Sequence, residues 1–406
     1  MKNGVVIIGS GHAGGMVAYY LRQKKFLESI TIIGDEKYLP YERPELSKQF
    51  LDDSLEKEKL FLKTEAFYKK QKIRIIRNCK VRDIDRHKKR VSIGENNYIE
   101  YGFLVFATGA NLKEIFKHSK IEIDYLKNIN HAERLKNQIK NKTSIGIIGG
   151  GYIGLEVASI ARKKNIATTI IEAENRLMKR VSTPPISEFF SKKHNENKVT
   201  IKLDTQVDKI SPSKTTNLIN CSDKSIVEAD IILAAIGVTP NSVLAEKIGL
   251  KCSDGILVDE HCLTSDKNIL AIGDCSNHFN SIYARQINLQ SVHNAAEQAK
   301  TAALYITNQR KAYSQVPWFW SNQYDTKLQI AGLSEGYDDL TIIGSKKENS
   351  FSVISLRQNQ ILAVESVNAP QDFVFGKKLI EKEIRINTKE LERFLNLRDL
   401  YKYLSL

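Results

Sequence analysis

The chain repeats one pattern, in which an apolar run is followed by a glycine turn and a helix-like stretch of small residues. The pattern is VVIIGSGHAGGMVAYYL from Val5 and IGIIGGGYIGLEVASIA from Ile145. Both copies fit G-x-G-x-x-G, whose glycines allow a tight turn, close approach of a pyrophosphate and close packing of the helix on the strand. The free N–H groups at such a helix start favour an anion. The repeat therefore predicts two dinucleotide-binding units in one chain.

An acidic residue follows the second apolar run of each unit. Asp35 stands 21 residues after Gly14, and Glu172 stands 18 residues after Gly154. A carboxylate at this point accepts hydrogen bonds from ribose hydroxyl groups. Each unit thus has both parts of the expected dinucleotide site.

The second unit is expected to prefer NAD over NADP. The Glu172 carboxylate would repel a 2′-phosphate. Arg176 and Arg180 follow it closely and would weaken that preference. NADP therefore stays open as an alternative coenzyme.

The apolar runs alternate with amphipathic, helix-like stretches, which is typical of parallel sheets covered on both faces. From about residue 312 the pattern changes to shorter alternating segments, which predict a mainly β domain ending in one or two helices. The predicted fold class is α/β, with two Rossmann-like dinucleotide-binding domains and a C-terminal α+β domain. The six buried strands are expected at Val5–Ile8, Ile30–Ile33, Phe103–Ala107, Ile145–Ile148, Thr168–Ile171 and Ile231–Ala235.

Composition excludes several classes of protein. No apolar run approaches the roughly 18 residues of a membrane span, and the N-terminus lacks the pattern of a secretory signal. The net charge of +14 comes from lysines spread along the chain, and no nucleic-acid-binding motif accompanies it. We therefore expect a cytoplasmic protein that binds neither nucleic acid nor membrane, while an acidic protein partner stays open.

The 5 cysteines are widely spaced, without a C-x-x-C pair or a His/Cys cluster. Such cysteines are expected to be reduced thiols, and no metal site is predicted.

Several segments resemble the bacterial NADH-dependent ferredoxin and rubredoxin reductases, FAD flavoproteins that supply electrons to oxygenases; apoptosis-inducing factor is a more distant relative. The resemblance covers essentially the whole chain. It implies an FAD-binding domain at residues 1–110 and 240–311, an NAD-binding domain at 111–239 and a C-terminal interface domain at 312–406. The most specific segments are LPYERPELSK, GGGYIGLEVA, LAAIGVTPN, ILAIGDCS, SVHNAAEQAK, VPWFWSNQYDTKLQIAGL and SVNAPQDF.

The resemblance also implies which residues contact the cofactors. Together with the glycine patterns, it predicts FAD contacts at Gly9, Gly11, Ala13, Gly14, Asp35, Arg43, Lys48, Val81, Thr108, Gly109, Asp274 and Val292. The predicted NAD contacts are Gly151, Ile153, Gly154, Glu172 and Gly237.

Three residues are expected to act at the flavin. The resemblance implies that Lys48 lies near flavin N5 and pairs with Glu156, and that Trp320 forms an aromatic wall at the exit route for electrons. Pro44 would direct the connector that delivers Lys48. Glu45 stands where the family commonly has a second proline, which makes the connector less stiff.

The predicted activity is that of an NADH-dependent flavoprotein oxidoreductase. Hydride passes from NADH to FAD, and single electrons then pass to a ferredoxin or rubredoxin that feeds an oxygenase. The active form is expected to be a monomer or a homodimer.

Two other activities stay open. An NADH oxidase, peroxidase or CoA-disulfide reductase would use a redox cysteine about 40 residues into the chain, whereas the first cysteine here is Cys79. An NADH-sensing flavoprotein resembling apoptosis-inducing factor is the non-enzymatic alternative.

Overall fold

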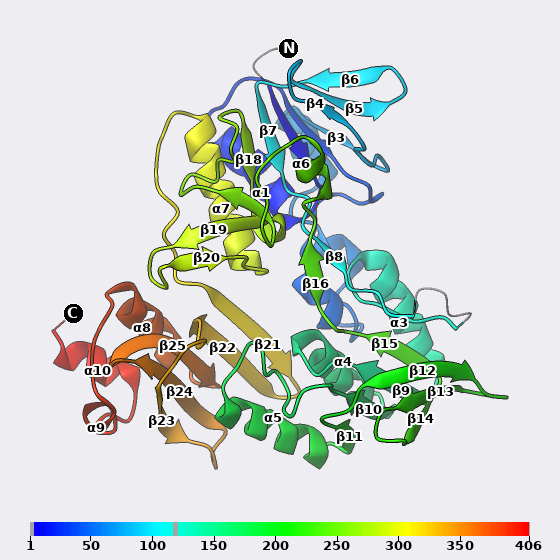
Figure 1. Cartoon of the computed structure of the whole chain (residues 1–406), viewed down its shortest axis with the longest axis vertical. Coiled ribbons are helices and arrows are strands. Elements are labelled where there is room, and N and C mark those ends of the chain that lie inside the picture. Colours follow the sequence, from blue (N-terminus) through cyan, green and yellow to red (C-terminus); the bar gives the residue numbers. More distant parts are fainter. Residues whose placement is uncertain (1–3, 117–120, 406) are drawn as a thin grey trace. The chain divides into compact units, whose positions relative to one another are not determined.

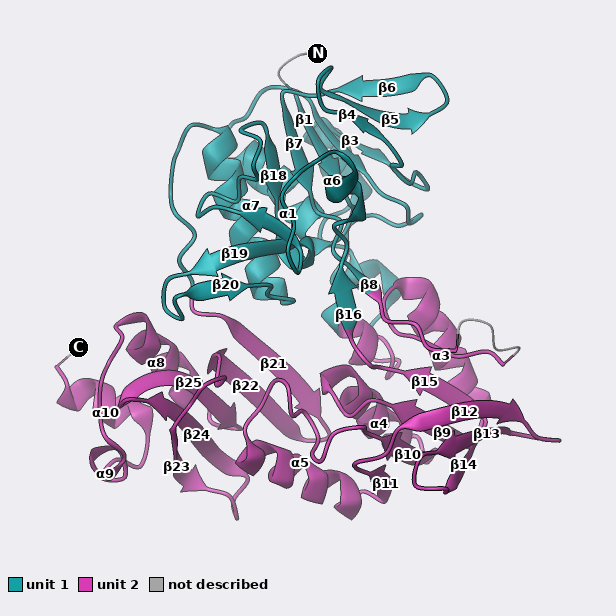
Figure 2. Cartoon of the chain, viewed as in Figure 1, with its two compact units in different colours: residues 1–44, 55–111, 238–315 teal, residues 45–54, 112–237, 316–406 magenta. Residues whose placement is uncertain are grey.

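The computed structural model describes residues 4–116 and 121–405. Its contacts divide the chain into two compact units, coloured separately in Figure 2. Unit 1 contains residues 1–44, 55–111 and 238–315, and unit 2 contains residues 45–54, 112–237 and 316–406. The chain therefore leaves unit 1 twice before completing it.

Unit 1 is built on a five-stranded parallel sheet, part of which is labelled in Figure 1. Its apolar strands are buried, and helices α1 (His12–Gln23) and α7 (Val292–Ile306) contribute small side chains to the same core. The strand order is β18 (Ile269–Ala271), β7 (Phe103–Phe106), β1 (Val5–Ile8), β2 (Ile30–Ile33) and β3 (Ile73–Ile76).

Unit 2 contains a second parallel sheet, of four strands. Helix α4 (Tyr152–Lys163) follows its strand β9 and is buried along most of its length. The strand order is β11 (Val199–Lys202), β10 (Ala167–Ile171), β9 (Ser144–Ile148) and β15 (Ile231–Ala234).

The C-terminal part of unit 2 is an antiparallel sheet followed by helices. The strand order is β21 (Trp318–Gln323), β22 (Thr326–Gly332), β25 (Gln360–Val367), β24 (Ser350–Arg357) and β23 (Asp339–Ser345). Helices α8 (Pro370–Glu381), α9 (Thr388–Leu391) and α10 (Leu397–Tyr403) follow. The short α9 is additional to the one or two helices expected.

The remaining elements connect or flank these sheets. The helical ones are η1 (Pro44–Ser47), η2 (Lys57–Leu60), α2 (Glu65–Lys70), α3 (Ile129–Asn141), α5 (Pro184–Glu196), α6 (Val243–Lys247) and η3 (Gly273–Cys275). Small sheets are formed by β4 (Ile84–Asp85), β5 (Arg90–Gly94) and β6 (Asn97–Glu100), by β12 (Val207–Pro212), β13 (Asn217–Cys221) and β14 (Ile226–Ala229), by β17 (Ile256–Val258), β19 (Ser276–Asn280) and β20 (Arg285–Ile287), and by β8 (Ala110–Leu112) with β16 (Val238–Pro240).

The predicted fold class is confirmed. All six apolar runs form strands of the two parallel sheets, and the region after residue 312 forms the mixed C-terminal part. The small sheets were not predicted, because most of their strands have only two to five residues. The three domain boundaries stay a prediction, since the contacts define two units.

Residues 45–54 belong to unit 2, although the residues on both sides belong to unit 1. Phe50 and Leu51 are buried, and the Lys136 ammonium lies 4.7 Å from the Phe50 ring. The Asp53 carboxylate pairs with Lys136 and, at 3.1 Å, with Lys140. The stretch that carries Lys48 is thus held by apolar packing and ion pairs of unit 2.

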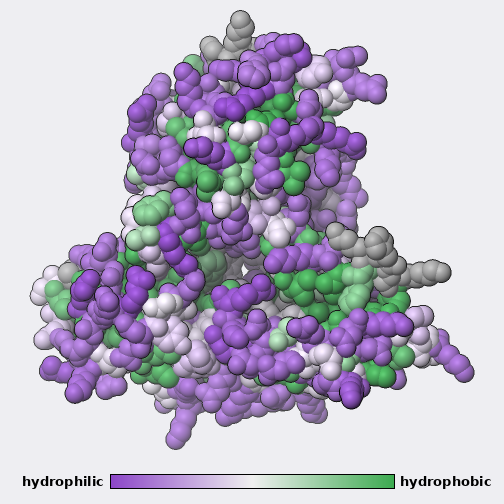
Figure 3. Space-filling view, viewed as in Figure 1, coloured by the Kyte–Doolittle hydropathy of each residue, from purple (hydrophilic) through white to green (hydrophobic). Residues whose placement is uncertain are grey.

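In the ranges 4–116 and 121–405, no helix is both long and apolar enough to cross a bilayer. Figure 3 shows hydrophilic residues spread over the face in view, interrupted by smaller apolar areas.

Candidate cofactor sites

The first glycine turn joins β1 to α1. Gly9 has φ +114, and a side chain there would place its Cβ 2.0 Å from the Ala107 carbonyl oxygen. A Cβ on Gly14 would lie 2.0 Å from the carbonyl oxygen of Gly9, so the helix approaches the turn closely only with glycine there. Gly11 is the N-cap residue and makes no side-chain cap. The first N–H groups of α1 are thus open to an anionic ligand.

Two further side chains of this turn fit a phosphate group. The Arg43 guanidinium lies 3.7 Å from the Cβ position of Gly11 and pairs with Glu36 at 2.6 Å. His12 Nδ1 is buried without a hydrogen-bond partner, and burial lowers the pKa of this side chain to about 4. A cation and an uncapped helix start at one turn fit the pyrophosphate of a dinucleotide.

The second glycine turn joins β9 to α4 with the same geometry. Gly149 has φ +106, and its Cβ would lie 2.6 Å from the Ala235 carbonyl oxygen. The Cβ of a residue at 154 would lie 2.2 Å from the Gly149 carbonyl oxygen. Gly151 caps α4 without a side chain, and nothing lies within 4 Å of its Cβ position. This turn also leaves space and N–H groups for a pyrophosphate.

Glu172 lies at the end of β10, beside the second turn. Its carboxylate accepts hydrogen bonds from the Gly150 N–H at 2.6 Å and the Glu174 N–H at 2.9 Å. Arg176 donates to the Ser182 carbonyl oxygen at 2.8 Å and to Ser187 Oγ at 2.7 Å. Glu172 therefore borders the turn, while the Arg176 guanidinium is bonded to the end of its own loop and to helix α5.

Lys48 and Glu156 form a buried ion pair. The Lys48 Nζ lies 2.8 Å from Glu156 Oε2, and the two side chains are 9% and 2% exposed. The hydroxyl groups of Ser47 and Ser321 also donate to this carboxylate. The Lys48 ammonium lies 5.7 Å from the centre of the Trp320 ring. A charged lysine, a carboxylate and a tryptophan ring thus meet in unit 2.

Comparison with known proteins identifies the family. The family model for pyridine nucleotide-disulphide oxidoreductases matches residues 3–299, and the model for the reductase C-terminal domain matches residues 318–400. This chain belongs to the pyridine nucleotide-disulphide oxidoreductases.

Full-length relatives include putidaredoxin reductase of Pseudomonas putida, 35% identical over 393 residues, which covers 95% of this chain and 93% of that protein. Rhodocoxin reductase of Rhodococcus erythropolis is 37% identical over 389 residues, covering 95% and 91%. The solved covalent complex of putidaredoxin reductase with putidaredoxin contains a chain with a TM-score of 0.94 and 34% identity, and 99% of each chain is covered.

Unit 1 of this oxidoreductase holds most of the predicted flavin contacts. Asp35 is exposed directly after β2, Val81 is half-buried, and Val292 is the first residue of α7. Asp274 lies in η3. Burial lowers the pKa of Arg43, but Tyr41, Glu36 and Asp274 raise it by more, so the net shift is upward. Arg43 and Asp274 thus interact electrostatically although they come from distant segments.

The strand end after β7 holds the Thr108–Gly109 pair. The Thr108 hydroxyl donates to the Asn241 carbonyl oxygen at 2.8 Å, and Gly109 has φ +65. Ala13 is buried in α1, and its Cβ lies 3.1 Å from the Cβ position of Gly273. Ala13 thus packs the start of α1 against η3, and Thr108 joins the segment after β7 to the residue that follows β16.

In unit 2, Ile153 is 43% exposed in the first turn of α4. Gly237 has φ +98, and its Cβ position lies 3.7 Å from the Arg180 guanidinium. The structure thus brings Arg180, which the sequence left as a weakening factor for NAD, next to a predicted NAD contact.

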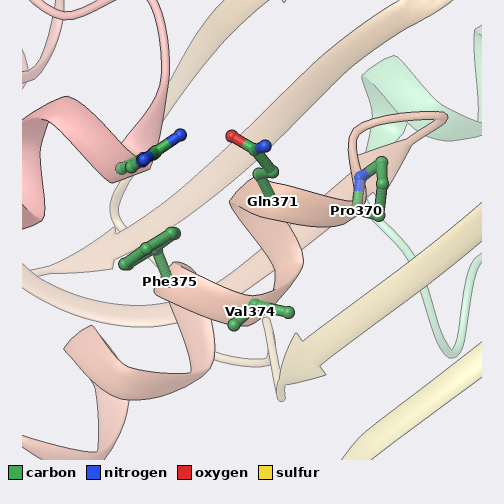
Figure 4. Close-up of a pocket in the computed structure, with 5 residues that line it drawn as sticks. Pro370, Gln371, Val374 and Phe375 are labelled. Carbon is green, nitrogen blue, oxygen red and sulfur yellow. The ribbon is translucent and has the colours of Figure 1, made fainter.

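Trp320 packs on Trp318, with ring centroids 5.3 Å apart. Both rings line a pocket of about 180 Å³ together with Asn322, Lys327 and Gln329. A larger pocket of about 360 Å³ lies on α8, and its lining of Pro370, Gln371, Val374, Phe375 and Arg398 includes no predicted site residue (Figure 4).

Two further polar side chains organise the sites, and neither was predicted from the sequence. Gln298 Oε1 accepts from the Gly273 N–H at 2.7 Å and from Ser276 Oγ at 2.9 Å, which fixes η3 against α7. The Glu365 carboxylate, fully buried in β25, accepts from the Ser182 hydroxyl and the Thr183 N–H. Gln298 lies in a segment already singled out, SVHNAAEQAK, whereas no local pattern marks Glu365.

The five cysteines are free thiols, and the described ranges hold no group of three His, Cys, Asp or Glu side chains able to bind a metal. Cys79 is half-buried, with Sγ 3.8 Å from the Ile93 carbonyl oxygen.

Proposed function

We propose that the protein is an NADH-dependent FAD oxidoreductase that passes single electrons to a small iron–sulfur protein or rubredoxin. The observation that carries the proposal is the pair of glycine turns with one geometry, each followed by an acidic residue, in a chain that also contains the buried Lys48–Glu156 pair. A ferredoxin reductase and a rubredoxin reductase are among the relatives that match over nearly the whole chain, and we infer that the acceptor here feeds an oxygenase.

The two cofactors are assigned to separate turns. FAD is proposed to bind at Gly9–Gly14, with Asp35 on its ribose and Arg43 at its pyrophosphate. NADH is proposed to bind at Gly149–Gly154, with Glu172 on its ribose. The proposed division is an FAD domain at 1–110 and 240–311, an NAD domain at 111–239 and an interface domain at 312–406.

Bound FAD supplies the chemistry, since a flavin takes a hydride from a nicotinamide and gives up its two electrons singly. The protein binds the cofactors, orients them and provides charge. The helix starts of α1 and α4 bind the pyrophosphates, and the carboxylates orient the adenosines. Lys48, paired with Glu156 at 2.8 Å, is proposed to provide positive charge at the flavin, with Trp320 as the aromatic wall. No side-chain nucleophile is required.

We further propose a cytoplasmic location, because the five cysteines are free. The oxidase, peroxidase and disulfide-reductase alternatives need a reactive cysteine near residue 40, and the first cysteine of the chain is Cys79. A Cys79→Ser variant is therefore expected to keep its NADH-dependent activity.

The test begins with the purified protein, which should be yellow and lose its flavin absorbance when NADH is added anaerobically. Stopped-flow reoxidation by a panel of ferredoxins and rubredoxins from the same genome should then identify an acceptor that reoxidises it faster than oxygen does. Colourless protein, or yellow protein that NADH does not bleach, contradicts the proposal. Slow reoxidation by every acceptor, with an NADH-dependent change in oligomer size, favours the NADH-sensing alternative.

A further inference from the structure

A continuous chain of buried hydrogen bonds leads away from the Lys48–Glu156 pair inside unit 2. Ser321 Oγ lies 2.8 Å from Glu156 Oε1, and Gln323 Nε2 lies 3.1 Å from Ser321 Oγ. Gln323 Oε1 lies 2.9 Å from His194 Nε2, and the Tyr324 hydroxyl lies 3.1 Å from His194 Nδ1. Ser321, Gln323 and His194 are fully buried, so water does not supply alternative partners.

The direction of every bond follows from the Glu156 end. Glu156 pairs with Lys48 as a carboxylate, so the Ser321 hydroxyl must donate its single proton to it. Ser321 Oγ can then only accept from its other neighbour, which makes the Gln323 –NH₂ group the donor. The Gln323 carbonyl oxygen therefore faces His194 and requires an N–H there.

The other end of the hydrogen-bond chain, at His194 and Tyr324, agrees with this direction of donation. Burial lowers the pKa of His194 to about 4, so the ring is neutral at pH 7 and carries one proton. That proton must sit on Nε2, which leaves Nδ1 as an acceptor for the Tyr324 hydroxyl. Burial raises the pKa of Tyr324, so its hydroxyl keeps its proton. All the donors thus point toward the Glu156 carboxylate.

We propose that Ser321, Gln323 and His194 are positioning residues of the Lys48–Glu156 pair, whose oriented hydrogen bonds hold Glu156 as a carboxylate that faces Lys48. A proton on Glu156 Oε1 would turn the Ser321 hydroxyl away and require reversal of each bond behind it, whereas a proton on Oε2 would oppose the donors Lys48 and Ser47. Cooperative bonds in a dry interior resist such reversal. The oriented bonds therefore fix the Glu156 carboxylate in the position in which it faces Lys48.

The other groups near the chain do not oppose this direction. Burial, with smaller contributions from Glu365 and Glu156, raises the pKa of Tyr152 on α4, which stays neutral. On α5, Lys193 is paired with Asp325 at 2.5 Å. From residues 45–54, Lys48 is the cation and Ser47 adds a neutral donor.

The first experiment tests the chain of hydrogen bonds and needs no activity measurement. Protein labelled with ¹⁵N-histidine should show, in a long-range ¹H–¹⁵N spectrum at pH 7, one neutral ring with a protonated Nε2 and unprotonated Nδ1, which a His194→Gln variant lacks. The ring should stay neutral at pH 5. A His194 signal from an imidazolium, or from the ring protonated on Nδ1, overturns the proposal.

The second experiment rests on the proposed function, because it follows the pH profile of NADH-dependent flavin reduction. Ser321→Ala removes one donor to a charged group and should move the acid limb upward by about one pH unit. Ser321→Thr keeps the hydroxyl group and should return the acid limb of the pH profile to its wild-type position. Ser355→Ala is the matched control, because the Ser355 hydroxyl is also buried and has no partner within the described chain.

A Ser321→Ala profile that coincides with wild type overturns the positioning role. If NADH reduces no variant, including wild type, the proposed function fails, and the His194 spectrum still decides this inference.

Discussion

At the scale of single residues, the Lys48–Glu156 pair is the feature with the largest expected effect. Both side chains are almost fully buried, and Glu156 also accepts from two serine hydroxyls. A buried pair is costly to break, because the partner left behind is a charge without compensation. The pair is therefore sensitive at either member.

Lys48→Ala is expected to lower the free energy of unfolding by about 3–5 kcal/mol, measured by urea denaturation, and to slow flavin reduction by NADH. Lys179→Ala is the control, since Lys179 and Glu174 form a 2.8 Å pair that is nearly half exposed. That control should change stability by less than about 1 kcal/mol. Unchanged FAD retention and reduction rate in Lys48→Ala would refute the proposed role of Lys48.

At the scale of elements, the second glycine turn contains one glycine that packing requires and one that only the proposed ligand requires. Gly154 and Gly151 lie three residues apart at the start of α4, yet only Gly154 has a carbonyl oxygen 2.2 Å from its Cβ position. Gly151 has an ordinary φ of -83 and open space around it. One position is restricted by the fold, and the other only by a ligand.

Gly154→Ala is expected to lower the thermal unfolding midpoint strongly, because the helix must move away from the turn. Gly151→Ala should leave that midpoint unchanged and raise the KM for NADH at least about tenfold, because the methyl group occupies the space proposed for the pyrophosphate. Equal NADH kinetics in Gly151→Ala and wild type would place the coenzyme elsewhere.

A second prediction at this scale concerns the loop between β10 and α5. Glu365 holds its end at Ser182 and Thr183, and burial raises the pKa of the Glu365 carboxyl. Glu365→Ala leaves these donors unsatisfied, at a cost of about 1–3 kcal/mol. The loop also carries Arg180, so the KM for NADH should rise while kcat stays within about twofold. A change in kcat alone would contradict a positioning role.

At the scale of the whole molecule, each unit contains a buried neutral histidine. Burial lowers the pKa of His278 in unit 1 and of His194 in unit 2 to about 4. The unfolded chain binds protons near pH 6.5, and the folded chain does so only near pH 4. The associated stability is therefore fully present above pH 6.5 and lost as the pH falls toward 4.

Between pH 7 and pH 5, each of these histidines should cost its unit about 2 kcal/mol of stability, measured by urea denaturation at both pH values. His278→Asn should make unit 1 less sensitive to this pH change, even if the variant is less stable at pH 7. The same loss of stability in wild type and variant would show that His278 is not neutral at pH 5.

The sequence alone was sufficient for the parallel strands, both glycine turns and the acidic residue after each second strand. These features depend on hydrophobic period and on backbone sterics within a few residues, which local sequence carries. The sequence was not sufficient to predict the contacts that bring distant residues together. Glu156 meets Lys48 across 108 positions and Ser321 across 165, and His194 meets Gln323 across 129.

The Lys48–Glu156 pairing was expected only from resemblance, and Ser321, Gln323 and Glu365 were not expected at all. The placement of residues 45–54 in unit 2 depends on Phe50, Leu51 and the lysines around Asp53. Such choices are made when side chains lose water and must find partners in the packed interior, and no spacing in the sequence encodes which partner is near. The sequence determined the two glycine turns, and the tertiary structure decided which buried charges lie together and which residues hold them.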